Sequence, residues 1–257
     1  MTEDPLRNTA RRGLASLDLT DLDEDSSEQS VRELCARAVT PHGPVAAVCV
    51  WPQFVPVAVN ALRRSGVRVC TVMSYPEGDH PTAEVLDMTA KAVADGAQEI
   101  DLVIPYKGLM EGHPNLVQAC VSRVKEAAGS ARLKAILESG VLGEAELIRT
   151  AAELSIEGGA DFIKTSTGKV PVNATPEAAR VILEVIKAKG GTVGLKPSGG
   201  IHTTADAKVY LDLCDEVMGP DWATPSTFRI GASSVLDAFL DTLDETTSLS
   251  SVSPGAY

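Results

Sequence analysis

Residues 160–169 read ADFIKTSTGK, a short apolar strand that carries a lysine in its middle and ends in a small polar loop. The stretch TVGLKPSGG at 192–200 repeats this pattern around Lys196. A charged ammonium group is costly among apolar neighbours unless the protein uses it. We therefore expect the rest of the chain to be a scaffold that holds Lys164 and Lys196 side by side.

Apolar segments of this kind alternate with helical segments along the whole chain. The expected strands cover residues 17–20, 45–51, 67–73, 99–105 and 133–138, the two lysine segments, and 228–232. The expected helices cover residues 2–16, 28–39, 52–65, 83–94, 115–128, 144–157, 176–190, 204–214 and 235–243. Continuous rather than alternating apolar runs indicate strands that are buried on both faces.

The eight-fold alternation predicts an α/β fold, a TIM (β/α)8 barrel in a single domain over residues 1–257. An extra helix precedes the barrel, and we expect a flexible tail from about residue 245, where Ser and Thr become frequent. An open doubly wound sheet is the alternative.

Composition excludes several classes of function. The net charge of -12 argues against a nucleic-acid partner, although a local pocket can still bind a small phosphorylated ligand. Five cysteines without a CxxC pair predict neither a disulfide framework nor a zinc site, and they favour a reducing, cytoplasmic compartment. The acidic start and the lack of a long apolar run predict no signal peptide and no membrane segment.

The two lysines suggest a specific chemistry. Alternate side chains of a barrel strand point inward, and active sites lie at the carboxyl ends of the strands. Lys164 and Lys196 fall in the neighbouring sixth and seventh strands, and Asp101 in the fourth strand can reach across the barrel mouth. Two close lysines disfavour double protonation, so one of them can become a neutral nucleophile that forms a Schiff base. The simpler alternative is that each lysine extends to solvent at the rim.

Glycine-rich segments follow the last two strands, as Ser198-Gly199-Gly200-Ile201 and Gly231-Ala232-Ser233-Ser234. Barrel phosphate sites are commonly built from these two loops. Gly168-Lys169 can add a charge, although ordinary βα turns are the alternative reading. No metal is expected, because His42, His80, His113 and His202 match no ligand spacing, and no GxGxxG motif predicts a dinucleotide cofactor.

Several long motifs resemble those of the deoxyribose-phosphate aldolase family. They are EIDLVIPY at 99–106, FIKTSTGKV at 162–170, VNATPE at 172–177, VGLKPSGGI at 193–201 and FRIGASS at 228–234, with AAVCVWPQF at 46–54. The resemblance implies a cofactor-free class I aldolase on a TIM barrel. It would reversibly cleave 2-deoxy-D-ribose 5-phosphate into D-glyceraldehyde 3-phosphate and acetaldehyde in deoxynucleoside breakdown.

The resemblance also implies roles for individual residues. Lys164 would be the Schiff-base lysine, Lys196 its proton-relaying neighbour, and Asp101 the proton donor and acceptor. Other matching positions would line the substrate pocket (Asp18, Thr20, Cys49, Lys134) or contact the phosphate (Gly168, Lys169, Gly199, Gly200, Gly231, Ser233, Ser234).

Two positions stay open. The family often has arginine where this chain has His202, which is a weaker phosphate partner or a rim residue. Tyr257 either moves a proton, as in some family members, or has no role. The remaining alternatives are an aldolase for another sugar phosphate and a catalytically silent sugar-phosphate-binding barrel. A homodimer is expected by analogy.

Overall fold

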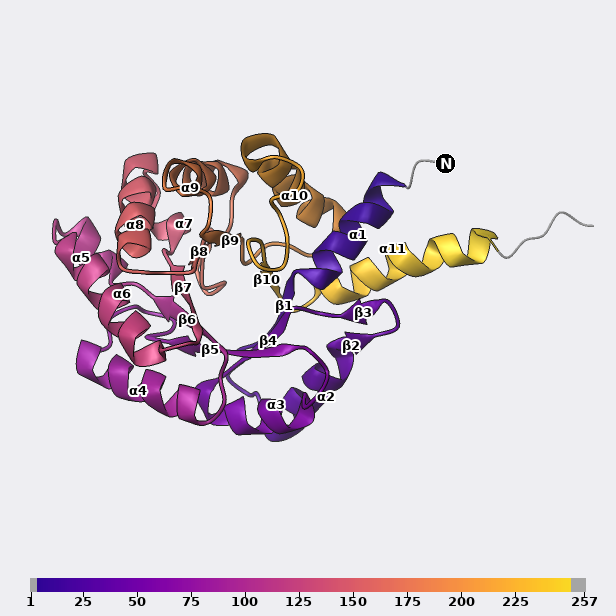
Figure 1. The fold of residues 1–257 in the computed structure, drawn as a ribbon, viewed down its shortest axis with the longest axis horizontal. Coiled ribbons are helices and arrows are strands. Elements are labelled where there is room, and N and C mark those ends of the chain that lie inside the picture. Colours follow the sequence, from indigo (N-terminus) through magenta and orange to yellow (C-terminus); the bar gives the residue numbers. More distant parts are fainter. Residues whose placement is uncertain (1–3, 251–257) are drawn as a thin grey trace, which may run out of the picture.

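Eight parallel strands form a ring in the computed structural model, which describes residues 4–250 (Figure 1). Hydrogen-bonded neighbours follow the order β10, β1, β4, β5, β6, β7, β8 and β9. Two backbone bridges, Leu195 with Phe228 and Ser198 with Gly231, close the ring between β9 and β10. Helices surround it on the outside (Figure 1). The predicted TIM barrel is confirmed, and the doubly wound alternative is wrong.

The barrel strands agree with the eight expected segments. They are β1 (Leu17–Asp21), β4 (Ala47–Val50), β5 (Arg68–Met73), β6 (Glu99–Val103), β7 (Arg132–Ile136), β8 (Phe162–Lys164), β9 (Gly194–Lys196) and β10 (Ile230–Ala232). The register pairs Lys164 with Lys196 and Asp101 with Lys134. Paired residues of neighbouring strands point to the same face, so all four side chains enter the barrel from adjacent strands.

The helices alternate with these strands. They are α1 (Pro5–Ala15), α2 (Glu28–Arg37), α3 (Val55–Ala61), α4 (Thr82–Ala94), α5 (Tyr106–Met110), α6 (Asn115–Ala128), α7 (Ser139–Leu142), α8 (Ala145–Glu157), α9 (Pro176–Ala188), α10 (Thr204–Met218) and α11 (Val235–Ser250). A two-stranded hairpin, β2 (Val39–Thr40) with β3 (Gly43–Pro44), lies outside the barrel sheet. The first and last helices, α1 and α11, lie side by side (Figure 1).

Local signals explain where several helices begin. The Thr175 side chain accepts a hydrogen bond from the Ala178 amide, and Pro176 takes the first helical position of α9, as the sequence predicts. Capping boxes at Ser27 and Thr203 start α2 and α10 in the same way.

Some boundaries differ from the expectation. The expected helix over 52–65 is a 3-10 turn, η1 (Pro52–Phe54), followed by α3, which ends before the left-handed residue Arg64 (φ 68°). The expected end of the last helix near residue 243 is too early, because α11 continues to Ser250. No Gly or Pro interrupts the chain there before Pro254. Residues 251–257, with Tyr257 and the rest of the expected tail, lie outside the described residues.

The core has two parts of opposite character. Apolar side chains fill the layer between strands and helices, for example Leu14, Val48 and Ile182, which are fully or almost fully buried. The interior of the barrel instead holds charged side chains, and the largest fully buried side chains include Arg229, Lys134 and Lys196. No helix within residues 4–250 is both long and apolar enough to cross a membrane.

Candidate active site

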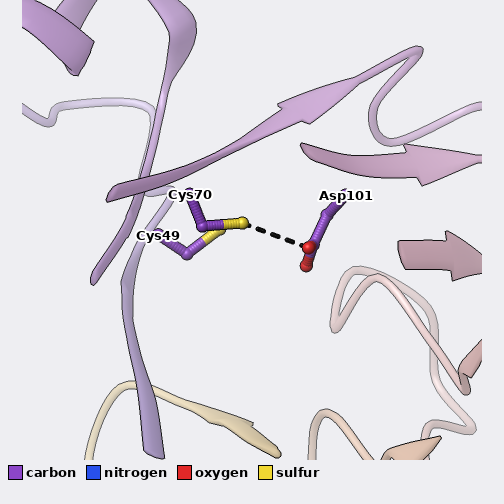
Figure 2. A group of neighbouring side chains, drawn as sticks. All are labelled: Cys49, Cys70 and Asp101. Atoms are coloured by element: carbon purple, nitrogen blue, oxygen red, sulfur yellow. Dashed lines mark hydrogen bonds between the residues drawn. The ribbon is translucent and has the colours of Figure 1, made fainter. Parts of the chain in front are cut away.

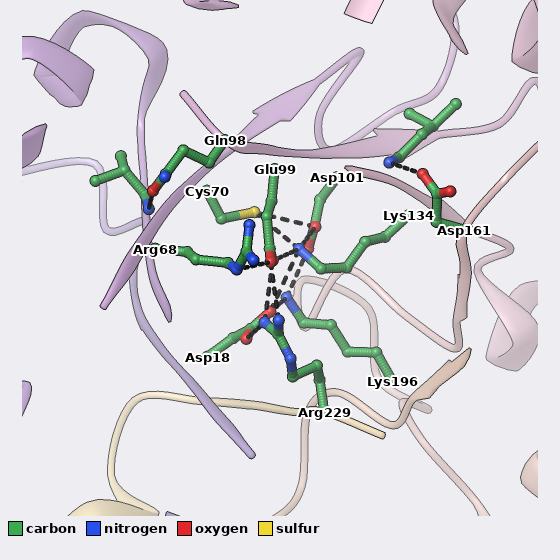
Figure 3. Close-up of polar contacts among 12 residues, drawn as sticks. Asp18, Arg68, Cys70, Gln98, Glu99, Asp101, Lys134, Asp161, Lys196 and Arg229 are labelled. Atoms are coloured by element: carbon green, nitrogen blue, oxygen red, sulfur yellow. Dashed lines mark hydrogen bonds and ion pairs between the residues drawn. The ribbon is translucent and has the colours of Figure 1, made fainter. Parts of the chain in front are cut away.

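Asp101 on β6 lies at the centre of the charged cluster inside the barrel (Figure 3). Its Oδ2 accepts hydrogen bonds from Lys164 Nζ at 2.9 Å and from Lys196 Nζ at 2.7 Å. Its Oδ1 accepts one from Lys134 Nζ at 2.8 Å. Three lysines from β7, β8 and β9 thus converge on one carboxylate, and neither Lys164 nor Lys196 extends to solvent at the rim.

Two further carboxylates, Asp18 and Glu99, form ion pairs with Lys134 or Lys196 but not with Lys164. Lys134 Nζ lies 2.7 Å from Glu99 Oε2 and 3.4 Å from Asp18 Oδ2, and Lys196 Nζ lies 2.5 Å from Asp18 Oδ2. Arg229 closes the network, because its guanidinium donates to Asp18 Oδ1 at 2.6 Å and to Glu99 Oε1 at 2.8 Å (Figure 3).

The cluster changes the proton affinity of its members. Burial by itself raises the pKa of Asp101, but the Lys134, Lys164 and Lys196 ammonium groups outweigh it and hold that pKa well below its usual range. Burial by itself lowers the pKa of Lys196, but the Asp101 and Asp18 carboxylates raise it above its usual range. Lys196 is therefore a protonated neighbour of Lys164, and Asp101 is ionised.

An open cavity of about 380 Å³ lies over this cluster, at the carboxyl ends of the strands. Lys164 is the cluster member on its wall. Other expected site residues also line it, namely Thr20, Gly168, Lys169, Gly199, Gly200, His202, Gly231 and Ser233. Lys164 therefore connects the buried charges with a space that can hold a small molecule.

The remaining expected site residues within residues 4–250 do not line the cavity. Asp18, Cys49, Asp101, Lys134 and Lys196 are fully buried. Ser234 is exposed, and its Oγ lies 3.0 Å from His202 Nδ1.

The loop after β9 packs closely against the loop after β8 and against strand β10. Gly199 and Gly200 have φ angles of 82° and 77°, a region that glycine adopts without strain. A Cβ at Gly199 would lie 2.7 Å from the Asn173 side chain, and one at Gly231 would lie 2.5 Å from Ser198 Oγ. Glycine at these positions lets the backbone segments pack closely, with the Gly199 amide donating to the Gly231 carbonyl at 3.3 Å.

The sequence model of the DeoC/LacD aldolase family matches residues 14–240 of this chain. The chain belongs to the DeoC/LacD aldolase family. Solved structures agree with this aldolase assignment over nearly the whole chain.

The apo form of a Toxoplasma gondii protein described as a deoxyribose-phosphate aldolase is 26% identical to this aldolase, with a TM-score of 0.86 over 96% of this chain and 99% of that one. QR15, an aldolase, is 30% identical, with a TM-score of 0.79 over 92% and 98%. The deoxyribose phosphate aldolase of Aeropyrum pernix, a tetramer, shares the fold at 24% identity, with a TM-score of 0.75 over 97% and 100%.

One group of side chains in the aldolase has the donor types of a metal site. Cys49 Sγ, Cys70 Sγ and an Asp101 carboxylate oxygen lie within 4.8 Å of one another (Figure 2). However, Lys134 Nζ lies 3.2 Å from Cys70 Sγ and 2.8 Å from Asp101 Oδ1. A cation at this position would have to displace that ammonium and face the Lys164 and Lys196 charges, so the arrangement does not favour a metal.

Four residues that shape the site had no predicted role. Glu99 and Arg229 complete the ion-pair network, and Glu138 and Tyr75 bind the loop after Lys164. The strand period provides a signal for the first two: Glu99 lies two residues before Asp101, and Arg229 two before Gly231, so each shares the inward face. No local pattern identifies Glu138 or Tyr75, because both act on a loop distant in sequence.

Proposed function

We propose that this aldolase cleaves 2-deoxy-D-ribose 5-phosphate reversibly into D-glyceraldehyde 3-phosphate and acetaldehyde through a Schiff base on Lys164. One observation carries the proposal: Lys164 is the lysine of the buried cluster that lines the cavity. Its side chain is only 3% exposed, and it shares Asp101 Oδ2 with Lys196. The similarity to deoxyribose-phosphate aldolases supports the choice of substrate.

The ion-pair partners distinguish Lys164 from the other lysines of the barrel cluster. Within the described residues, the barrel cluster has four buried cations (Lys134, Lys164, Lys196, Arg229) and three buried carboxylates (Asp18, Glu99, Asp101). The partly exposed Arg68 lies at its edge, 3.6 Å from Glu99. One excess positive charge in a buried site is unfavourable, and losing one proton removes it. Lys134 contacts three carboxylates and Lys196 contacts two, whereas Lys164 contacts Asp101 alone. Lys164 therefore has the fewest ion-pair partners of the three lysines and is the one that reaches the cavity.

The neutral amine then starts the reaction. Lys164 Nζ attacks the aldehyde carbon of the open-chain sugar, and loss of water leaves a protonated imine. A base takes the proton of the hydroxyl on carbon 3, and the bond between carbons 2 and 3 breaks. Its electron pair moves toward the imine nitrogen to form an enamine, and glyceraldehyde 3-phosphate leaves. Protonation of carbon 2 and hydrolysis of the imine release acetaldehyde and restore the amine.

Proton transfer is assigned to Lys196 and Asp101. Lys196 Nζ lies 2.7 Å from Asp101 Oδ2, the oxygen that also accepts from Lys164 at 2.9 Å. The lowered pKa of Asp101 and the raised pKa of Lys196 favour a resting site in which the mobile proton is on Lys196. Asp101 passes protons between Lys196 and the substrate, with a water molecule where the distance requires one.

The phosphate is assigned to the glycine-rich segments that line the cavity. Lys169 supplies a charge, and Gly168, Gly200 and Ser233 offer backbone and hydroxyl groups. Gly199 and Gly231 line the same cavity, but their amides donate to the Gly231 and Pro197 carbonyls, so they shape the site. Ser234 contributes at the edge through its contact with His202. Thr20 lines the cavity, and Cys49, Lys134 and Asp18 support the site from within the barrel.

Borohydride trapping with acetaldehyde, followed by peptide mass spectrometry, tests this proposal. We expect a two-carbon adduct on the peptide that contains Lys164. Lys164→Ala should abolish the adduct and the cleavage of the sugar phosphate while the circular dichroism spectrum is unchanged. An adduct on Lys196 would exchange the two lysine roles, and no adduct in a folded sample would refute the Schiff-base mechanism.

The remaining expectations are part of the same proposal. The enzyme would act in deoxyribonucleotide catabolism in the cytoplasm, without a cofactor, and as a homodimer. Assays of several sugar phosphates would separate this substrate from others, because cleavage of 2-deoxyribose 5-phosphate releases acetaldehyde. Light scattering would distinguish a dimer from the tetramer found for the Aeropyrum pernix enzyme.

A further inference from the structure

The turn after β7 binds the chain beyond the catalytic strand β8. The Leu137 amide donates to the Lys164 carbonyl at 3.0 Å, and the Ser139 amide donates to the Thr165 carbonyl at 2.8 Å. Glu138 lies between Leu137 and Ser139 in the chain, and its side chain extends the contact to Thr167. Its Oε2 accepts from Thr167 Oγ1 at 2.6 Å, and its Oε1 accepts from the Thr167 amide at 3.3 Å.

Glu138 has a backbone conformation that glutamate rarely adopts. Its φ and ψ angles are 56° and 54°, in the left-handed region, and the residue is fully buried. Glycine would adopt this conformation without strain but would provide no side chain. Strain at a non-glycine residue persists where the surrounding structure requires it, often next to a functional site. Here the retained side chain is the one that binds Thr167.

The same turn also contacts the far end of the loop. A Cβ at Gly140 would lie 1.8 Å from the Val172 carbonyl oxygen, so the backbone of α7 packs directly against the backbone at Val172. The turn at 138–140 therefore braces the loop both at Thr167 and at Val172. Gly168 and Lys169, the expected phosphate contacts, lie between these two points.

Tyr75 completes the hold on Thr167. Its hydroxyl donates to the Thr167 carbonyl at 2.9 Å, and its ring packs edge-on against Trp51 at 5.6 Å. Thr167 Oγ1 also accepts from the Lys169 amide at 3.1 Å. The amide, hydroxyl and carbonyl of Thr167 are thus all bonded, by side chains that are 29 and 92 residues away in sequence. Such a residue has little freedom to move.

We propose that Glu138 is a positioning residue that, together with Tyr75, fixes Thr167 and so places Gly168 and Lys169 to receive the phosphate group of the substrate. Glu138 acts through Thr167 rather than on the reacting atoms, whereas Tyr75 holds Thr167 and also lines the cavity. The inference rests on the proposed function for its substrate, but the clamp on Thr167 can be measured without any activity.

Steady-state kinetics of Glu138→Gln test the positioning role. Glutamine keeps the shape but offers one acceptor oxygen where the Thr167 amide and hydroxyl need two. We expect KM for 2-deoxyribose 5-phosphate to rise about tenfold with kcat changed less than about twofold. Tyr75→Phe should raise KM in the same direction but less. Borohydride trapping of acetaldehyde on Lys164 should be unchanged in both variants, because acetaldehyde has no phosphate.

The matched control is Glu146→Gln. This is the same chemical change on α8, at a side chain that is 85% exposed, and no kinetic change is expected. A lower kcat with unchanged KM and a shifted pH profile in Glu138→Gln would overturn the positioning role in favour of proton transfer. Loss of trapping together with a lower melting temperature would overturn it in favour of a purely structural role.

Hydrogen exchange separates this inference from the proposed function. The amides of residues 165–169 should exchange faster in Glu138→Gln than in the parent chain or in Glu146→Gln. Unchanged exchange would refute the clamp even if the enzyme were active. If the parent chain formed no adduct on Lys164, the proposed function would fail, and the exchange rates would still decide whether Glu138 holds the loop.

Discussion

Lys164 and Lys196 are directly paired across β8 and β9, and both donate to the same oxygen, Asp101 Oδ2. Their other contacts differ: Lys196 also binds Asp18, whereas Lys164 lines the cavity. The two lysines occupy paired positions on neighbouring strands, but Lys196 has one carboxylate partner more than Lys164.

Removing the Lys196 charge should slow the reaction without removing the nucleophile. In Lys196→Met, Asp101 Oδ2 has Lys164 as its one remaining partner, and the proton source next to it is lost. We expect kcat/KM to fall by about a hundredfold or more, consistent with the loss of a general acid-base group. Steady-state kinetics measure this, and trapping of the Lys164 adduct at long incubation should still succeed. Kinetics equal to those of the parent chain would contradict the role given to Lys196.

Asp18 should contribute strongly to folding stability. Asp18→Asn leaves the buried Lys196 and Arg229 without a charged partner at this position, and breaking a buried ion pair costs about 3–5 kcal/mol. Urea unfolding at neutral pH measures the change. The matched control is Asp212→Asn at the exposed pair with Lys208, for which a change below about 1 kcal/mol is expected. Equal small effects of both variants would refute the contribution.

The pH dependence of stability follows from the same carboxylates. Burial raises the pKa of Asp18 and of Asp101, but the surrounding cations outweigh it and lower each pKa from 3.8, and the pKa of Glu99 is lowered from 4.5 in the same way. A lowered folded-state pKa stabilises the fold above the unfolded-state value, and this stability is lost as the pH falls toward the folded-state value. We expect the unfolding free energy contributed by the cluster to be constant from neutral pH down to about 4.5 and to fall below it. Asp18→Asn should show a shallower decrease in urea titrations at pH 2–5.

Gly199 should be required for the phosphate end of the site. A Cβ at Gly199 would lie 2.7 Å from Asn173, and its φ of 82° is strained for alanine. We expect Gly199→Ala to raise KM for the phosphorylated sugar about tenfold or more through displacement of the loop, with adduct formation from acetaldehyde preserved. Gly66→Ala is the matched control, because Gly66 has a φ of 81° but no atom near its added Cβ. If both variants affected KM equally, the close approach to Asn173 would not be the cause.

His202 occupies a position at which the resembling family often has arginine, and replacing it tests its role. It lines the cavity with Nδ1 3.0 Å from Ser234 Oγ. In His202→Arg, a guanidinium that can bind phosphate with two hydrogen bonds replaces the imidazole. We expect KM for 2-deoxyribose 5-phosphate to fall several-fold, while the rate with unphosphorylated 2-deoxyribose is unchanged. An equal change with both sugars would show that His202 does not face the phosphate.

Much of the architecture could be predicted from local sequence. Apolar runs identified most of the barrel strands, because burial on both faces leaves a composition that loops and surface helices do not have. The first strand, in which Leu17 and Leu19 alternate with Asp18 and Thr20, had the weakest signal. Thr175 and Pro176 identified the start of α9, because capping involves groups only three residues apart. Helix ends were less well predicted, and α11 continues seven residues past the expected end at 243.

The sequence by itself determined the barrel and the neighbouring positions of Lys164 and Lys196, because strand order and side-chain alternation follow from periodicity along the chain. Only the tertiary structure decided which carboxylate each lysine meets. Asp18 reaches Lys196 across 178 positions and Arg229 across 211, and Glu138 holds Thr167 across 29. These pairings depend on ring closure and on side-chain length and direction inside it. No local pattern encodes such contacts, since their energies exist only when distant segments meet.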